Sequence, residues 1–168
     1  MCSWKNPNFS ELFDQSKQSI SDGAFNYYCL DAASLIPVLM LDLKKGDELL
    51  DMCAGPGGKS LAAMQTFKPK RIVCNDIDGS RVTRVKHVMQ SYLCNRFNEE
   101  IGMNIIQYSK RDGQSCPNVF DQEFDKVLCD VPCYTDRHTL FQDDNNIFKS
   151  HMAKERLRMP ELQASLLL

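Results

Sequence analysis

The chain has 168 residues, which is enough for one domain with a substantial core and too few for two domains of ordinary size. Apolar residues make up 43% and charged residues 25%, a composition that excludes general disorder, and the net charge of -2 does not by itself indicate a nucleic-acid binder. The charge is uneven, since residues 137–158 carry five Lys and Arg against three acids. Such a segment is more often a solvated helix face than a phosphate-binding patch.

The amino-terminal part of the sequence is polar and poorly periodic, and we expect residues 1–25 to form an entry arm before a domain at 26–168. It has no signal pattern, and Glu11 and Asp14 argue against a transit peptide. No apolar run approaches membrane-spanning length. The eight cysteines show no C-x-x-C spacing and no histidine cluster accompanies them, so we predict mostly buried, free thiols in a reducing compartment and no metal site.

The apolar segment at 27–41 predicts a mostly buried helix that Pro37 kinks or divides. Short β-favouring runs then alternate with helical stretches. The alternation predicts an α/β fold with a parallel, doubly wound sheet. The strands are expected at 48–53, 71–75, 104–108 and 124–131, and the helices at 58–66, 80–93 and about 151–168.

The sequence ends within an apolar helical run, without a glycine cap or a following strand. The fourth strand would then leave Val127 to Cys129 as an unpaired apolar edge, which is an aggregation hazard. We therefore expect a sheet that is incomplete, with about four strands, and a chain that is a fragment of a longer domain.

A glycine-rich turn, Asp51–Ser60 (DMCAGPGGKS), joins the first expected strand to a helix. Glycines let the backbone approach a ligand, and a helix amino terminus offers free N–H groups. The dinucleotide-binding motif G-x-G-x-x-G would need a third glycine at position 60, where this sequence has Ser60. The phosphate-binding motif G-x-x-x-x-G-K-[ST] matches this sequence at residues 58–60, but its first glycine is replaced by Cys53. The third candidate ligand is S-adenosylmethionine.

Acidic residues after the later strands favour S-adenosylmethionine. Asp76 ends the second strand, where a carboxylate can accept both ribose hydroxyls, and Asp112 with Gly113 follows the third strand within reach of an adenine amine. Each Asp alone is more often a cap or turn residue. Together with Asp130 they make three acids on successive strand ends of one crevice, where ligands of such sheets bind.

The fourth strand ends in Asp130-Val-Pro-Cys133, a combination that indicates a particular reaction. Methylation of carbon 5 of a pyrimidine needs a thiolate that adds to carbon 6, and a carboxyl group that bonds N3 and the exocyclic amine of a cytosine. Cys133 and Asp130 are of these two kinds. The alternative interpretation of Cys133 is a buried thiol after a proline turn.

These motifs resemble the Sun-domain family of RNA (cytosine-5) methyltransferases. Its D-x-C-A-A-P-G-G-K-[ST] motif matches residues 51–60 with a departure only at Gly55, and its D-x-P-C matches 130–133. Residues 27–35, 130–138 and 145–149 are similar to the mitochondrial ribosomal-RNA branch. The resemblance covers about residues 25–168. It implies a Rossmann-like class I methyltransferase fold, S-adenosylmethionine as cofactor, ribosomal RNA as substrate, a mitochondrial location and a helical-repeat partner of the transcription-termination-factor type.

The resemblance also implies roles for individual residues. Lys59 would lie at the methionine end of the donor, with Gly57 and Gly58, and Asp130 would lie between donor and base. The ribose and adenine would be bound by Asp76, Arg81, Asp112 and Gly113.

The catalytic cysteine needs separate treatment. In this family the covalent nucleophile lies in a Thr-Cys element on the next strand, and the Pro-Cys cysteine, here Cys133, helps release the product. No Thr-Cys pair occurs in the 168 residues. We therefore expect little or no turnover from this chain alone, unless Cys133 itself attacks. A non-catalytic product that binds the donor or a protein partner, and a P-loop nucleotidase, are the alternatives.

Overall fold

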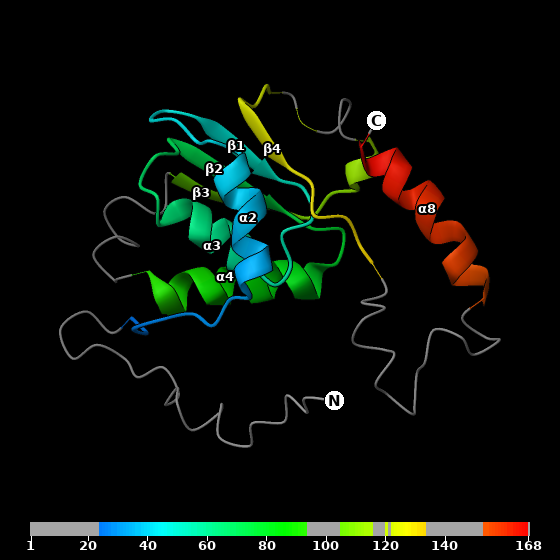
Figure 1. The fold of residues 1–168 in the computed structure, drawn as a ribbon, viewed down its shortest axis with the longest axis horizontal. Coiled ribbons are helices and arrows are strands. Elements are labelled where there is room, and N and C mark those ends of the chain that lie inside the picture. The colour runs from blue at the N-terminus through cyan, green and yellow to red at the C-terminus, as the bar shows by residue number, and fades with distance from the viewer. Residues whose placement is uncertain (1–23, 94–104, 116–119, 121, 134–152, 168) are drawn as a thin grey trace, which may run out of the picture.

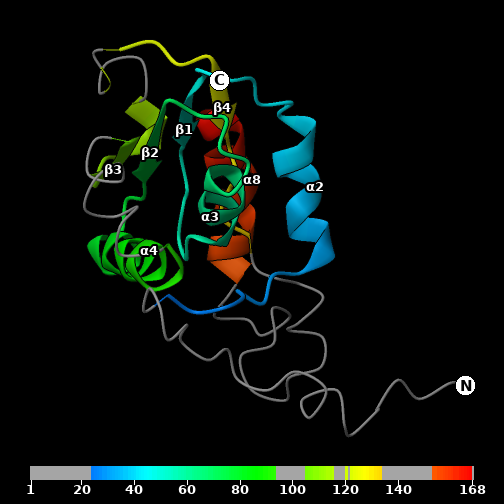
Figure 2. The ribbon, with the colours of Figure 1, turned by 90° about the vertical axis from the view of Figure 1, so that its left-hand side faces the viewer.

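The computed structural model describes residues 24–93, 105–115, 120, 122–133 and 153–167, and shows four parallel strands with helices packed against them (Figure 1). Helices α2, α3 and α4 gather on one side of the sheet, with α3 between α2 and α4 in Figure 2, and α8 stands apart beside the end of β4. No described helix is long and apolar enough to cross a membrane. The elements are α2 (Ala32–Met40), β1 (Glu48–Asp51), α3 (Gly58–Met64), β2 (Arg71–Asn75), α4 (Gly79–Tyr92), β3 (Ile106–Ser109), the short 3-10 helix η2 (Gly113–Ser115), β4 (Lys126–Leu128) and α8 (Ala153–Leu167).

The strand order is β3-β2-β1-β4, and every pairing is parallel. The parallel α/β sheet of four strands is therefore confirmed. Among the described residues β4 pairs with β1 alone, and the outward side chain of Val127 is 45% exposed. This is the apolar edge that the sequence predicted.

One face of the sheet carries the main core. Its strand residues pack against α3 and α4 because alternate side chains of a strand point to the same face. The most enclosed members, at most 1% exposed, are Leu49, Leu61, Ala63, Ile72, Cys74, Val85 and Met89. Removing such a side chain leaves a cavity, and truncation of Leu49 to Ala is of the kind that costs about 2–5 kcal/mol.

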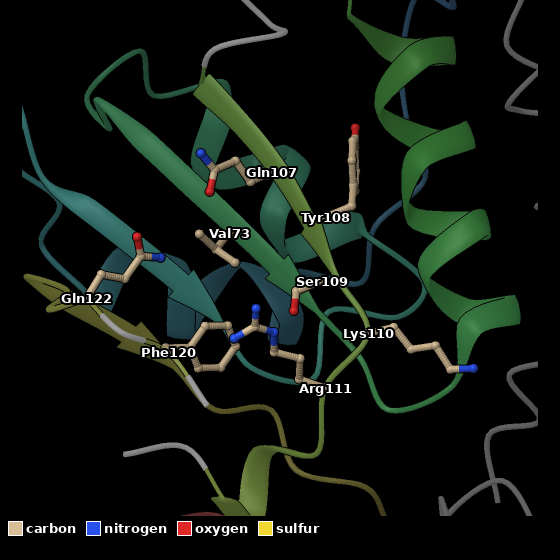
Figure 3. A pocket seen from close by; sticks show the side chains of 8 residues that line it. All are labelled: Val73, Gln107, Tyr108, Ser109, Lys110, Arg111, Phe120 and Gln122. Atoms are coloured by element: carbon tan, nitrogen blue, oxygen red, sulfur yellow. The ribbon is translucent and has the colours of Figure 1, made fainter. Parts of the chain in front are cut away.

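The other face carries a smaller apolar cluster and a cavity of about 440 Å³. Phe120 and Leu166 cover Leu50 and Val73 there. The cavity opens beside them, and Figure 3 shows Arg111 lying between Phe120 and the ends of the strands, with its guanidinium 5.4 Å from the ring centre. None of the residues assigned to the donor or to catalysis lines this cavity.

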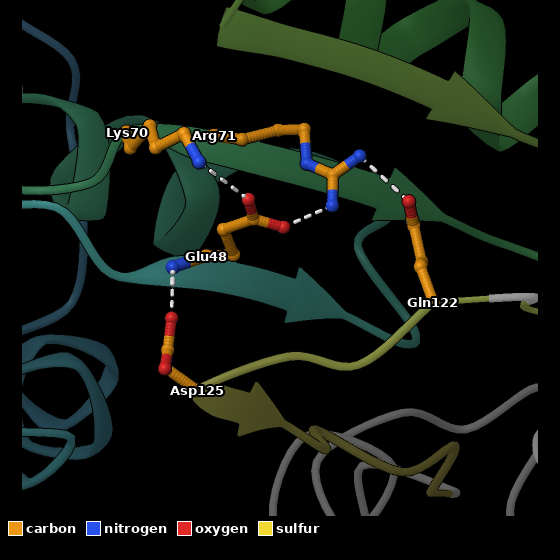
Figure 4. A network of polar contacts seen from close by, with 5 residues as sticks. All are labelled: Glu48, Lys70, Arg71, Gln122 and Asp125. Carbon is orange, nitrogen blue, oxygen red and sulfur yellow. Dashed lines mark hydrogen bonds and ion pairs between the residues drawn. The ribbon is translucent and has the colours of Figure 1, made fainter.

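A polar network joins three strands at the amino-terminal edge of the sheet (Figure 4). The Glu48 carboxylate accepts hydrogen bonds from Lys70 at 3.0 Å and from the Arg71 guanidinium, which also donates to Gln122 at 2.6 Å. The Glu48 N–H donates to Asp125 Oδ2 at 2.9 Å, and the Asp125 N–H donates to the Glu48 carbonyl at 3.0 Å. The hydrogen bonds from Lys70 and Arg71 hold the pKa of Glu48 below its usual value.

Several predicted boundaries are wrong. Helix α2 begins at Ala32 and not at residue 27, because Asp31 caps it by accepting the Ala33 N–H at 3.2 Å. Pro37 lies inside this helix and does not divide it. β4 has three residues where 124–131 was expected, since its pairing covers only residues 49–51 of β1 and the chain then turns toward Pro132, which has no N–H to pair.

The Glu48 network generates a prediction about stability and pH. A lowered folded-state pKa means that the ionised carboxyl stabilises the fold above its unfolded-state pKa of about 4.3, and that this stabilisation is lost as the pH falls through the folded-state value. We expect Glu48→Gln to lower the melting temperature more at about pH 7 than at about pH 3. Glu123→Gln, at an exposed neighbouring acid, is the control. Equal losses at both pH values would contradict the assignment.

Candidate functional site

The glycine turn after β1 is held in place by close packing on two sides. Gly57 has φ 111°, and a Cβ there would lie 3.2 Å from the Val85 Cα of α4. A Cβ on Gly58 would lie 2.8 Å from Leu30 Cδ1 in the segment before α2. Both glycines are therefore needed for the turn to reach α4 and that segment, whether or not a ligand binds.

Asp76, at the carboxyl end of β2, is fixed by the backbone around it. It is 3% exposed, and its two carboxylate oxygens accept the N–H groups of Gly55 at 3.1 Å and of Asp78 at 3.0 Å. Gly55 is the position that departs from the family motif. A Cβ there would lie 2.8 Å from both Asp76 Oδ2 and Arg81 Cβ, so the turn, Asp76 and the start of α4 are in direct contact.

Asn75 joins the ends of three strands through one buried amide. Its Nδ2 donates to the carbonyls of Met52 and Arg111, each at 3.0 Å, and its Oδ1 accepts the Arg111 N–H at 3.0 Å. The segments after β1, β2 and β3 are therefore held at fixed positions. Sequence reasoning did not single out Asn75, although an amide at the end of an apolar strand was a visible signal.

Asp51 ends β1 beneath the turn and is 1% exposed. Its Oδ2 accepts a hydrogen bond from Ser60 Oγ at 2.5 Å, and its Oδ1 has no hydrogen-bond partner in the part of the chain that the structure describes. Burial away from water raises the pKa of Asp51 to about 7. Asp51 is the first residue of the glycine-rich motif, and no role was predicted for it.

Lys59 and Asp130 form an ion pair of 2.6 Å between the first turn of α3 and the segment after β4. The Lys59 side chain is 19% exposed and that of Asp130 is 52% exposed. The pair brings together two residues that were assigned to the donor site from motifs about 70 positions apart in the sequence.

Two cavities meet at the glycine turn. One of about 350 Å³ is lined by residues including Arg81, Arg84, Asp130 and Cys133, and one of about 150 Å³ by residues including Asp51, Lys59 and Asp130. Residues common to both are Cys53, Gly55, Pro56 and Asp130. Five residues assigned to the donor or to catalysis therefore line these adjoining cavities at the carboxyl edge of the sheet, namely Gly58, Lys59, Arg81, Asp130 and Cys133.

Two thiols, Cys53 and Cys133, line the larger cavity and differ in their surroundings. Burial raises the pKa of Cys53 to about 12, so it stays protonated at neutral pH. Cys133 is exposed. Of these two, Cys133 is the thiol that a substrate can reach, and the alternative of a buried thiol after a proline turn is wrong.

Asp112 and Gly113 follow β3 as predicted, and Gly113 packs against α8. Asp112 Oδ1 accepts the Gln114 N–H at 3.0 Å, which caps η2. A Cβ on Gly113 would lie 2.9 Å from Leu166 Cδ2 and from Met52 Cγ. Neither residue lines the two cavities at the glycine turn.

Helix α8 is bonded both to the loop after β4 and to η2. Gln163 Nε2 donates to the Pro132 carbonyl at 2.8 Å, Cys129 Sγ to the Leu166 carbonyl at 3.4 Å, and Ser165 Oγ to Gln114 Oε1 at 3.0 Å. No sequence signal predicted these bonds, because they join segments that meet only in the folded chain.

Residues 38–168 match the model of a protein family described as 16S rRNA methyltransferase RsmB/F. The chain is 43% identical over 145 residues to mouse 5-cytosine rRNA methyltransferase NSUN4, covering 86% of this chain and 37% of that protein. It is 38% identical over 140 residues to a mouse protein named tRNA (cytosine(34)-C(5))-methyltransferase, mitochondrial, covering 83% and 38%. Among solved structures, NSun6 from Pyrococcus horikoshii with SFG aligns with a TM-score of 0.61 at 20% identity, covering 83% of this chain and 33% of that chain.

A parallel sheet with the glycine turn, Asp76 and Asp130 at its carboxyl edge defines a Rossmann-like methyltransferase domain, and the solved structure supports that fold. The chain belongs to the 16S rRNA methyltransferase RsmB/F family. This confirms the Sun-domain resemblance and S-adenosylmethionine as the cofactor of the domain, and it decides against a P-loop. The chain spans a little over a third of the length of the curated relatives it matches.

The glycine packing generates a second prediction. Gly57 and Gly46 both have positive φ, but a Cβ on Gly46 meets nothing within 4 Å, whereas one on Gly57 meets the α4 backbone. We expect Gly46→Ala to cost about 1 kcal/mol of unfolding free energy from backbone strain alone, and Gly57→Ala about 2–4 kcal/mol, because packing is disturbed as well. Urea unfolding measures both. Equal losses would mean that the contact with Val85 relaxes freely.

Proposed function

We propose that this chain forms the methyl-donor half of an S-adenosylmethionine-dependent RNA cytosine-5 methyltransferase. The observation that carries the proposal is the convergence of the glycine turn, the Lys59–Asp130 pair and Cys133 on adjoining cavities. Strand ends that lie far apart in the sequence meet at this edge, which is where ligands of parallel α/β sheets bind.

We assign the donor along this edge by its chemistry. The smaller cavity, with Lys59 beside Gly58, takes the amino-acid end. The ribose lies toward Arg81, which lines the larger cavity, and toward Asp76, which is buried beside the glycine turn and lines neither cavity. The adenine lies toward Asp112 and Gly113, where the exposed carboxylate of Asp112 can accept from the exocyclic amine. Gly57 shapes the turn beneath the donor.

The reaction centre lies at the end of β4. Bound S-adenosylmethionine would supply an electrophilic methyl group there. We infer that Asp130, which is paired with Lys59 and lines the same cavity as Cys133, bonds the cytosine ring. We infer that the exposed thiol of Cys133 acts on the base, in product release by resemblance to the family, or as the attacking nucleophile in the alternative.

We infer further that the substrate is ribosomal RNA and that the protein acts in mitochondria. The proposal is supported by the names of the relatives, which include a 5-cytosine rRNA methyltransferase and a mitochondrial tRNA (cytosine(34)-C(5))-methyltransferase. A helical-repeat protein of the transcription-termination-factor type is the proposed partner. With a net charge of -2 the chain gains little phosphate affinity from its overall charge, and a partner could supply it.

Donor binding is the first test. We expect calorimetry to show that the chain binds S-adenosylmethionine and that Asp112→Ala weakens it about tenfold, through loss of one hydrogen bond to a charged acceptor. Glu123→Ala is the control. Glu123 precedes β4, at the amino-terminal edge of the sheet, and its loss should leave the affinity for S-adenosylmethionine unchanged. Failure of the unaltered chain to bind the donor, or binding of ATP with Mg²⁺ instead, would contradict the proposal.

Methyl transfer is the second test. Because these 168 residues hold no Thr-Cys pair, we expect the chain alone to transfer little or no labelled methyl group to ribosomal RNA fragments. Cys133→Ser should leave donor binding intact, since the thiol lies at the base end of the cavity. Robust transfer that Cys133→Ser abolishes would contradict the assignment to product release and identify Cys133 as the nucleophile. Capture of a protein partner by a chain that neither binds the donor nor transfers a methyl group would favour a non-catalytic role.

A further inference from the structure

The cavity of about 440 Å³ on the face of the sheet opposite the main core has no part in the proposed function. Gln107 and Ser109 of β3 line it, because alternate side chains of a strand share a face and Ile106 and Tyr108 pack with the main core. No acidic residue is among the described residues that line the cavity. Its wall is therefore polar without being negative, which suits a ligand that accepts hydrogen bonds.

Arg111 brings a cation to this cavity, and the folded chain fixes its position. Its backbone N–H and carbonyl both bond to the side-chain amide of Asn75 at 3.0 Å, and its guanidinium lies 5.4 Å from the centre of the Phe120 ring. No carboxylate pairs with this guanidinium in the part of the chain that the structure describes. The aromatic ring supports the guanidinium and leaves its N–H donors available to an oxyanion.

Arg71 is a second arginine with aromatic support, and its guanidinium is differently engaged. It lies 5.8 Å from the centre of the Phe124 ring, and it also donates to the Glu48 carboxylate and to Gln122. Arg71 therefore has acceptors within the fold. Arg111 has the same kind of support from a ring and no acceptor among the described residues.

Two neutral donors line the same cavity. Ser109 Oγ is buried and has no hydrogen-bond partner among the described residues. Gln122 accepts from Arg71 through Oε1 at 2.6 Å, which leaves its amide nitrogen to donate elsewhere. Figure 3 shows the Ser109 hydroxyl pointing toward Arg111. Buried polar atoms of native proteins are nearly always bonded, so an unbonded hydroxyl next to an unpaired guanidinium indicates a ligand that accepts from both.

We propose that this cavity is a second binding site, which takes the phosphate group of a nucleotide. Arg111 and Ser109 donate to the phosphate oxygens, and a guanidinium binds such oxygens in pairs. A phosphate group alone fills a small part of 440 Å³, and the amides of Gln107 and Gln122 offer hydrogen bonds to the sugar or base that carries it. A free nucleotide and an RNA strand both present this group. The inference is independent of the proposed function, because none of the residues assigned there lines the cavity.

The test compares uridine 5′-monophosphate with uridine, which differ only in the phosphate group. Neither carries the adenine of the methyl donor or the cytosine of the proposed reaction. We expect titration followed by NMR to show that the nucleotide binds about tenfold or more tightly than uridine, with the largest amide shifts at residues 107–111 and 122. Saturating S-adenosylhomocysteine should not displace it. Equal affinities for the two ligands, or shifts that gather at the glycine turn, would overturn the inference.

Two matched variants separate a built site from general attraction to basic residues. Arg111→Gln and Lys110→Gln each remove one positive charge at adjacent positions. The Lys110 ammonium lies at the start of α4, 3.3 Å from where a Cβ on Gly79 would be, and points away from the cavity in Figure 3. We expect Arg111→Gln to weaken binding of the nucleotide about tenfold and Lys110→Gln less than about twofold. Equal losses would refute the site.

Ser109→Ala tests the hydroxyl without disturbing the fold. Because no described residue bonds to Ser109 Oγ, its removal should leave the melting temperature unchanged. The affinity for the nucleotide should fall about threefold, through loss of one hydrogen bond. A lower melting temperature with unaltered affinity would show that the hydroxyl serves the fold and would count against the inference.

A uridine oligonucleotide distinguishes the two sources of the phosphate group. If an RNA strand supplies it, the oligonucleotide binds at least as tightly as the mononucleotide and is weakened equally by Arg111→Gln. If a free nucleotide supplies it, only the mononucleotide depends on Arg111. Independence of both ligands from Arg111 would contradict the proposal. Failure of the chain to bind S-adenosylhomocysteine would instead refute the proposed function and leave this site in place.

Discussion

The amide of Asn75 is the interaction on which the site geometry depends. Parallel strands leave their carboxyl ends side by side, and backbone bonds such as that from the Ala54 N–H to the Asn75 carbonyl hold only part of the loops that follow. Asn75 binds the backbone after β1 and after β3 through three hydrogen bonds of 3.0 Å, and Asp76 beside it binds the glycine turn. Loss of the amide would leave buried backbone groups unbonded, at about 1–3 kcal/mol each.

The site concentrates charge in a part of the molecule that excludes water. Asp51 and Asp76 are at most 3% exposed, and Lys59 is largely covered. Asp76 is compensated by two N–H groups, and Lys59 by Asp130. Asp51 is compensated on one oxygen only. Burying these charges in an empty site makes the fold less stable than apolar residues at the same positions would. Binding of an oppositely charged ligand offsets this loss of folding free energy.

The sheet could be predicted well from the sequence because hydrophobic periodicity and the positions of glycines indicate which segments prefer strand, helix or turn. All four strands and the three helices expected after residue 50 are present, and boundary errors arose where a cap or a pairing partner decided the end, as at Asp31 and Lys126. Residue types at strand ends likewise pointed to Asp130 and Cys133, which line the larger cavity, and to Asp76, which lines neither cavity. The Asp51–Ser60 bond and the Asn75 bridges could not be predicted, since they depend on distances between segments that only the packed chain defines. The same holds for the burial of Gly113 under α8.

Helix α8 makes its contacts at two places, which lie at opposite ends of the proposed donor site. Gln163 holds the Pro132 carbonyl beside Cys133, and Ser165 with Leu166 contacts η2 beside Asp112. A hinge motion of this one helix would therefore shift the reaction end and the adenine end together. Local opening of α8 and occupancy of the donor site are then thermodynamically linked, so a bound donor would slow amide hydrogen exchange in a helix that it need not touch.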